Sequence, residues 1–275
     1  MIIWLASYPK SGNTFLRSII ASLVYSEDGN FEMDKLASIR QFPRTVHFEG
    51  LTNDTGNIHE IKKYWVAAQE KINLNNKVIF FKTHNANIKI DNYPFTNKKN
   101  TLATIYVVRD PRNVVSSIAH HYSLSMNESK KFILTQKSLR DTLEGEEKGI
   151  LTPLGTWSDH YNSWTLHNNN LLIIKYEDLI NKPKEELDKI IIFLKPFINF
   201  SVNENKINKI IETTKFDSLK KMEKEGKYDE YAHGRKNFNF FNKGPKNKWQ
   251  DNLEVDIKDE IEKKFYNLMK KLGYL

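Results

Sequence analysis

The segment Ile2–Thr14 reads IIWLASYPKSGNT, and this stretch decides the fold class. Its first five residues are apolar and predict a strand that is buried on both faces. A loop of mostly polar residues follows. After the loop, apolar residues recur on one face at helical spacing, at Leu16, Ile19, Ile20, Leu23 and Val24. The segment therefore predicts a strand, a loop and a helix in succession.

Three further apolar runs, residues 78–82, 102–108 and 171–175, have the character of buried parallel strands. Helical patterns follow the third and fourth strands, and an amphipathic helix closes the chain over residues 257–272, with Gly273 as its stop. This alternation predicts an α/β fold. We expect one domain over residues 1–275, with a central parallel β-sheet flanked by helices.

The composition limits the classes of function. The chain of 275 residues is 39% hydrophobic, which is enough for a globular core. It has no cysteine, which excludes disulfides and thiol nucleophiles and fits a reducing compartment. No run approaches the roughly 18 apolar residues of a membrane span, and no leader is visible, so we expect a cytoplasmic protein. The net charge of +8 favours an anionic partner, although a compositional bias towards lysine would give the same charge.

The loop at residues 8–14, YPKSGNT, is suited to bind an anion. The first N–H groups of a helix and the helix dipole favour a phosphate or sulfate at this position. Gly12 permits close approach of the backbone, Lys10 supplies charge, and Ser11 and Thr14 supply hydroxyls. An ordinary capped turn is equally consistent with this local pattern. It is not the triphosphate-binding pattern G-x-x-x-x-G-K-[ST], because Lys10 precedes Gly12.

Residues 7–15, SYPKSGNTF, resemble the 5′-phosphosulfate-binding loop of the cytosolic-type sulfotransferases that use 3′-phosphoadenylyl sulfate (PAPS). The fold of that family is related to the P-loop nucleotide kinases. The resemblance implies that the 5′-phosphosulfate is held by Lys10, Ser11, Gly12, Asn13 and Thr14. Phe15 stands where the family usually has a tryptophan that stacks on adenine.

A second anion site is expected at residues 105–117, IYVVRDPRNVVSS, where Arg109 ends a strand. Ligands of open α/β sheets bind at that edge. A surface arginine paired with Asp110 is the alternative interpretation. The segment resembles the 3′-phosphate-binding stretch of the family, in which an arginine and a serine eight residues later grip the phosphate. Those positions match Arg109 and Ser117, and two separate anion sites suit a bisphosphorylated adenosine better than ATP.

The resemblance implies further nucleotide contacts. Tyr176, in the segment KYEDL, and Thr214 match family positions that contact the nucleotide. Residues 224–251 are rich in Lys, Asn and Phe without a clear period, which is typical of a lid or binding loop. Arg235 and Lys236 within it resemble a late basic segment that covers the 3′-phosphate, although Asn237 replaces the usual glycine.

The catalytic residues are expected beside the donor. Lys-Thr-His at residues 82–84 follows a strand and resembles the catalytic segment of the family. His84 is the predicted general base for an acceptor hydroxyl, and Lys10 and Lys82 are predicted to stabilise the charge that develops during transfer. The remaining histidines, including His120 and His121, are interpreted as structural. This scheme requires no metal and releases 3′-phosphoadenosine 5′-phosphate (PAP).

The acceptor is not specified by the sequence. It is expected to be a small molecule, a glycan or a lipid, bound by variable loops near residues 42–56, 85–95 and 138–153. The dimerisation signature of the family is not preserved at residues 250–259, and nucleic acid is not the expected partner. The alternative functions are a P-loop-type small-molecule kinase, a basic nucleotide-binding or nucleic-acid-binding protein without catalysis, and an inactive member of the family.

Overall fold

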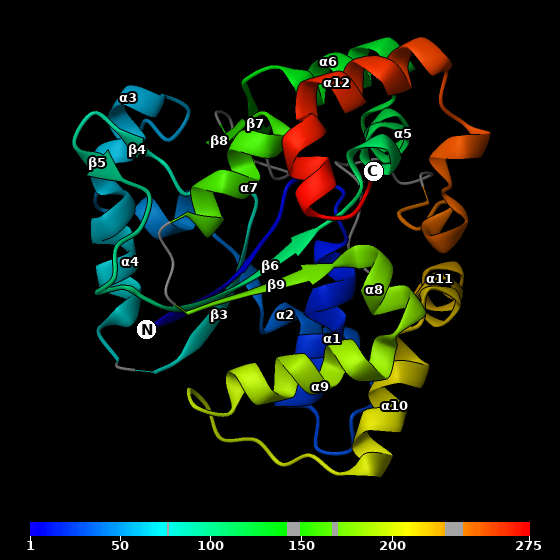
Figure 1. Cartoon of the computed structure of the whole chain (residues 1–275). Coiled ribbons are helices and arrows are strands. Elements are labelled where there is room, and N and C mark those ends of the chain that lie inside the picture. The colour runs from blue at the N-terminus through cyan, green and yellow to red at the C-terminus, as the bar shows by residue number, and fades with distance from the viewer. Residues whose placement is uncertain (76, 142–148, 167–169, 229–238) are drawn as a thin grey trace.

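The computed structural model describes residues 1–75, 77–141, 149–166, 170–228 and 239–275 (Figure 1). Its centre is a five-stranded parallel sheet with the order β2-β3-β1-β6-β9. The strands are β1 (Ile2–Ala6), β2 (Arg40–Gln41), β3 (Ile79–Thr83), β6 (Thr101–Val108) and β9 (Leu171–Lys175). Because all five run in the same direction, their carboxyl ends meet at one edge of the sheet.

The four predicted strands are all present, within one residue at each end. β2 was missed, since two residues are too short for a periodic pattern. Two antiparallel hairpins were also missed, in segments where variable loops were expected. They are formed by β4 (Lys89–Ile90) with β5 (Tyr93–Pro94), and by β7 (Lys137–Asp141) with β8 (Ile150–Gly155).

Helices cover both faces of the sheet (Figure 1). The helices are α1 (Asn13–Tyr25), α2 (Met33–Ala37), α3 (Ile58–Ile61), α4 (Trp65–Asn73), α5 (Pro111–Tyr122), α6 (Met126–Leu134), α7 (Trp157–Thr165), α8 (Tyr176–Asn181), α9 (Pro183–Leu194), α10 (Glu204–Thr214), α11 (Phe216–Lys224) and α12 (Val255–Lys271). Short 3-10 turns lie at Thr45–Phe48, Lys62–Tyr64, Gly244–Lys246 and Trp249–Asp251. None of the helices in the described ranges has the length and apolar character needed to cross a membrane.

The alternation of side chains along β1 divides the interior into two cores. Trp4 belongs to one core, which packs against α4, α5, α7 and α12. Ile3 and Leu5 point to the opposite face and pack against α1, α9 and α10. Both faces of β1 are therefore dry, as its continuous apolar run predicts. The predicted central sheet with helices on both faces is confirmed.

The first core contains a buried polar residue, His160, whose side chain is fully enclosed. Its Nδ1 accepts from the Tyr106 hydroxyl at 2.8 Å, and its Nε2 donates to the His84 carbonyl at 3.0 Å. Burial lowers the pKa of His160 from 6.5 to about 4. The ring is thus neutral, with one tautomer fixed by its two partners.

This histidine makes the stability depend on pH. Between pH 6.5 and 4, His160 binds a proton in the unfolded chain but stays neutral in the folded protein. The free energy of unfolding should therefore fall by about 1.4 kcal/mol for each pH unit of acidification because of this group. We expect His160→Gln to be less stable at pH 7 but to lose less stability on acidification. Urea unfolding at pH 7 and 5 tests this, and equal losses in both proteins would contradict it.

Candidate active site

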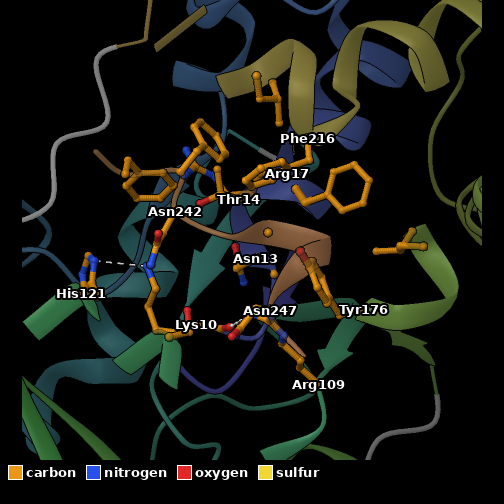
Figure 2. Close-up of a pocket in the computed structure, with 18 of the residues that line it drawn as sticks. Lys10, Asn13, Thr14, Arg17, Arg109, His121, Tyr176, Phe216, Asn242 and Asn247 are labelled. Atoms are coloured by element: carbon orange, nitrogen blue, oxygen red, sulfur yellow. Dashed lines mark hydrogen bonds between the residues drawn. The ribbon is translucent and has the colours of Figure 1, made fainter. Parts of the chain in front are cut away.

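A large cavity of about 2130 Å³ lies at the carboxyl edge of the sheet (Figure 2). It is lined by segments that follow each of the five strands. This is the edge at which open α/β sheets bind their ligands. Pockets for one small ligand usually have about 300–1,000 Å³. The cavity therefore has room for two substrates side by side.

The loop after β1 has the backbone of an anion site. Gly12 caps α1 with a φ of 101°, and Lys10 also adopts a left-handed φ of 64°. The Asn13 amide donates to the Leu5 carbonyl at 2.9 Å and to the Ser7 hydroxyl at 3.1 Å, so this side chain fastens the loop to the end of β1. The first N–H groups of α1 have no acceptor within the helix. The Ser11 hydroxyl is buried here without a protein partner among the described residues.

Gly12, Tyr176 and Arg109 form one compact stack. A Cβ atom on Gly12 would lie 2.3 Å from Cδ2 of Tyr176, so only glycine fits at this position. The Arg109 guanidinium packs over the Tyr176 ring, 4.3 Å from the ring centroid. Arg109 Nη1 donates to the Lys10 carbonyl at 3.2 Å, while its buried Nε has no partner among the described residues. Unused donors beside the loop fit an anionic ligand.

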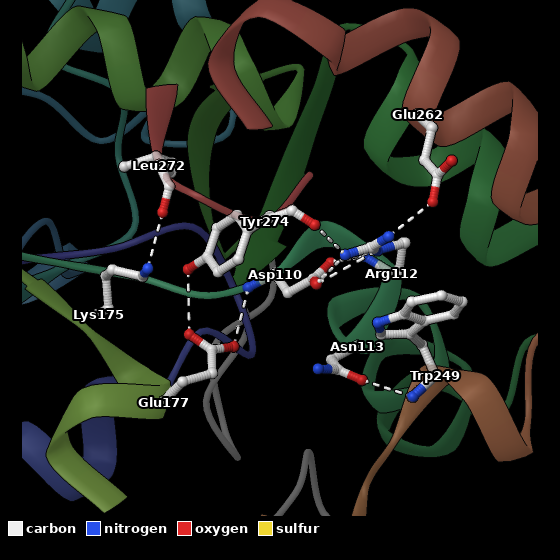
Figure 3. Close-up of polar contacts among 9 residues, drawn as sticks. All are labelled: Asp110, Arg112, Asn113, Lys175, Glu177, Trp249, Glu262, Leu272 and Tyr274. Carbon is white, nitrogen blue, oxygen red and sulfur yellow. Dashed lines mark hydrogen bonds and ion pairs between the residues drawn. The ribbon is translucent and has the colours of Figure 1, made fainter. Parts of the chain in front are cut away.

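Asp110 pairs with Arg112, and the interpretation of Arg109 as a surface arginine paired with Asp110 is wrong (Figure 3). Arg109 is only 6% exposed, and the carboxylate of Asp110 lies 2.7 Å from Arg112 Nη2. Asp110 also caps α5 by accepting from the Arg112 N–H at 2.9 Å. Arg109 is therefore left facing the cavity rather than an acid.

The C-terminal segment holds this edge of the sheet in place (Figure 3). Arg112 also contacts Glu262 at 2.6 Å and the Tyr274 carbonyl at 2.7 Å. The Tyr274 hydroxyl donates to Glu177 at 3.0 Å, and Glu177 accepts from the Asp110 N–H at 3.1 Å. Burial raises the pKa of Glu177. These bonds join the ends of β6 and β9 to the C-terminal segment.

Residues 240–247 of the predicted lid line the cavity. Asn247 accepts from the Ser116 hydroxyl at 2.8 Å and donates to the Asn113 carbonyl at 2.9 Å. The Arg112 guanidinium lies 4.0 Å from the ring centroid of Trp249. This part of the segment is thus attached to α5, the helix that carries Ser117. Arg235 and Lys236, predicted nucleotide contacts, lie outside the described residues.

The Lys10 ammonium donates to His121 Nδ1 at 3.2 Å and lies 4.9 Å from the Phe240 ring centroid (Figure 2). His120 and His121, which were interpreted as structural residues, both line the cavity. Their helical pattern and the absence of metal-ligand spacing gave no sign of this contact. Only the fold brings α5 beside the loop after β1.

His84 lines the cavity at the end of β3 and is half-buried. Its Nδ1 lies 2.8 Å from the Ser7 carbonyl, which can only accept, so Nδ1 carries the proton and Nε2 keeps its lone pair. Burial, then the Lys82 charge, lower the pKa of His84 well below its usual value. The ring is therefore neutral at physiological pH and able to accept a proton. The bond from His160 to its carbonyl fixes the backbone beneath it.

The other predicted site residues that the structure describes are all gathered in this cavity. They are Thr14, Phe15, Lys82, Ser117 and Thr214. Sequence reasoning missed several residues of its wall, among them Arg17, Arg44 and Arg140. Trp157, Tyr161 and Trp164 recur at i, i+4 and i+7 on α7 and are buried in the core.

Comparison with known proteins agrees with this geometry. A family model described as "Sulfotransferase domain" matches residues 2–273. The amine sulfotransferase of Oryctolagus cuniculus is 22% identical, over 98% of this chain and 80% of its own length. Sulfotransferase 1B1 of Mus musculus is 27% identical, over 79% of this chain and 65% of its own length. The crystal structure of mouse sulfotransferase SULT7A1 with PAP has a TM-score of 0.59 at 22% identity and covers 98% of this chain and 84% of that chain.

The chain belongs to the sulfotransferase domain family. The sulfotransferase family predicted from residues 7–15 and 105–117 is thereby confirmed.

Gly12→Ala should disturb the nucleotide site. The added methyl group must displace Tyr176, which holds Arg109, so we expect a clear loss of PAP affinity in calorimetric titration. Gly50→Ala is the matched control, because its φ of 75° gives similar backbone strain, about 1–2 kcal/mol, without a neighbour within 4 Å. If both variants bound PAP like the parent, the stack would have no part in binding.

Arg112→Ala should destabilise the fold strongly. It leaves Asp110 buried without its cation, which costs about 3–5 kcal/mol in the free energy of unfolding. Lys99→Ala removes an exposed ion pair with Glu70 and should cost less than about 1 kcal/mol. Denaturant unfolding measures both values, and similar losses in the two variants would contradict the importance of the Arg112 network.

Proposed function

We propose that the chain binds PAPS across the ends of β1, β6 and β9 and uses His84 to activate an acceptor hydroxyl or amine. The observation that carries this proposal is the convergence of two separate anion sites and a neutral histidine on one cavity. The loop after β1 is one anion site, and Arg109 with Ser117 is the other. The unused Ser11 hydroxyl and Arg109 Nε support a ligand with two anionic groups.

The residues that would hold the nucleotide follow from their positions. The loop residues Lys10, Ser11, Gly12, Asn13 and Thr14 would bind the 5′-phosphosulfate, largely through backbone N–H groups. Arg109 and Ser117 would bind the 3′-phosphate. Phe15, Tyr176, Thr214 and Phe216 would enclose the adenosine, since all four line the same end of the cavity. Arg235 and Lys236 remain predicted contacts of the 3′-phosphate.

The reaction requires a base and a means to stabilise charge. PAPS supplies a sulfuryl group on a phosphate that leaves as part of PAP. His84 Nε2 takes the proton of the attacking acceptor hydroxyl while Nδ1 keeps its bond to the Ser7 carbonyl. Lys82 lies beside His84 and Lys10 lies in the loop, so both ammonium groups are placed to stabilise negative charge on either side of the transferred group.

The segment at residues 239–247 would cover the nucleotide, because Phe240, Phe241 and Asn247 line its end of the cavity. The acceptor would be a small molecule, a glycan or a lipid. The absence of cysteine fits action in the cytoplasm. We also propose that residues 1–275 form a single domain.

Paired variants test the assignment. His84→Ala should lower turnover by about 10²–10⁴-fold and leave PAP affinity intact, because the base does not hold the nucleotide. Arg109→Ala should weaken PAP binding instead. Calorimetry with PAP and a sulfotransfer assay separate the two effects. Full activity of His84→Ala would remove His84 as the base, and thermal stabilisation by ATP without any response to PAP would favour a kinase.

The pH profile gives a second readout of the same proposal. Because the pKa of His84 lies well below 6.5, the base stays neutral as the pH drops past that value. We expect kcat/KM for PAPS to remain level at pH 6.5 and to decline only at lower pH. A decline centred at or above pH 6.5 would show that another group acts as the base.

A further inference from the structure

We infer that the acceptor is an amphipathic acid: a hydroxyl-bearing molecule with an apolar body and a carboxylate, sulfate or phosphate group. The inference rests on the proposed function and adds the chemical class of the acceptor. It comes from the side chains that line the part of the cavity beyond His84.

The order of the sheet divides the cavity into two ends. The proposed nucleotide contacts follow β1, β6 and β9 on one side of the centre. His84 follows β3, and Gln41 and Arg44 lie at and after β2, on the other side. The hairpin of β7 and β8 completes that side with Leu139, Arg140 and Thr152. With the nucleotide over β1, β6 and β9, the acceptor must lie over β3 and β2.

Among the described residues, the charged side chains that line the acceptor end are all cationic. Arg44, Lys82 and Arg140 line it, each from a different segment of the chain. Among the described residues that line the whole cavity, Asp217 is the single carboxylate, and it lies on α11 beside Thr214 and Phe216 at the nucleotide end. Burial, followed by the charges of Arg44 and Arg40, lowers the pKa of His47 to about 4, so both arginines lie close enough to act on that ring.

Three apolar or aromatic side chains accompany these cations. Tyr122 and Met126 come from the end of α5 and the start of α6, and Leu139 comes from β7. The Arg140 Nη2 donates to the Gly56 carbonyl at 3.1 Å, which places the guanidinium over the segment that follows Arg44. The wall thus combines a surface for an apolar body with guanidinium groups, whose fork geometry matches carboxylate, sulfate and phosphate.

The charge decides among acceptor classes. An ammonium group would be repelled by three cations, and a neutral acceptor would cover guanidinium groups without replacing their water. An anionic group near the hydroxyl pairs with them instead. A hydrogen bond to a charged partner typically changes affinity by about 10- to 100-fold, which is the preference we expect for an acid over its neutral analogue.

A matched series tests this inference on the full chain. 3-(4-Hydroxyphenyl)propionate, its amide and tyramine share one phenol and differ in charge, and 4-hydroxybenzenesulfonate and 4-hydroxyphenyl phosphate vary the acid. Binding to the enzyme with PAP is measured by calorimetry, and turnover with PAPS is measured in parallel. We expect the acids to bind about 10- to 100-fold more tightly than the amide, and tyramine most weakly. The advantage should shrink as salt is raised from 0.01 to about 1 M.

Two variants assign the preference to the arginines. Arg44→Gln and Arg140→Gln should each reduce the ratio of acid to amide affinity while PAP affinity stays unchanged. Arg40→Gln is the matched control, because Arg40 is exposed on β2 and does not line the cavity. Arg140 is also exposed, so its replacement tests the inference even if Arg44→Gln does not fold.

The results separate this inference from the proposed function. Equal binding of acid and amide, tighter binding of tyramine, or no binding of any acid overturns the acidic acceptor, whatever PAP does. A preference that survives both arginine variants overturns it as well. Failure of PAP to bind overturns the proposed function instead, and the acid preference is then still measured on the enzyme without nucleotide.

Discussion

The site depends on the contact between the Gly12 backbone and the ring of Tyr176. That ring contacts the loop after β1 and also packs against the guanidinium of Arg109 at the end of β6. The ends of β1, β6 and β9 thereby fix the positions of the two proposed anion sites relative to each other. Arg109 Nη1 also donates to the carbonyl of Lys10, whose backbone has a left-handed φ. Arg109, a proposed ligand of one anion, therefore also holds the strained backbone of the loop proposed to bind the other.

The sequence predicts the parts of the site that lie at the ends of long, apolar strands. Ile2–Ala6 is apolar throughout and buried throughout, so the loop after it could be placed at the carboxyl edge without any knowledge of tertiary contacts. Arg109 and His84 follow strands of the same kind. The partners of these residues could not be predicted in that way. Tyr274 lies 162 residues from Arg112, and no local pattern links the two.

The sequence predicts acceptor loops near residues 42–56 and 138–153, but it does not single out Arg44 and Arg140 within them. Arg44 follows a strand of two residues, and Arg140 lies in a hairpin whose strands are held mainly by each other. Such short elements have too few residues for a period to emerge. Loops on a common fold carry its specificity. The class of acceptor is therefore inferred from the structure, whereas the donor is predicted from the sequence.

The two ends of the cavity are coupled through charge. Burial, followed by the Lys82 charge, lowers the pKa of His84. The lysine that would attract an anionic donor therefore also helps to keep the proposed base neutral. The fully enclosed His160 holds the backbone of His84 in place. Its Nε2 donates to the His84 carbonyl, and its Nδ1 accepts from the Tyr106 hydroxyl. Binding of anions adds negative charge beside His84 and so raises its affinity for the proton at the stage when it must accept one.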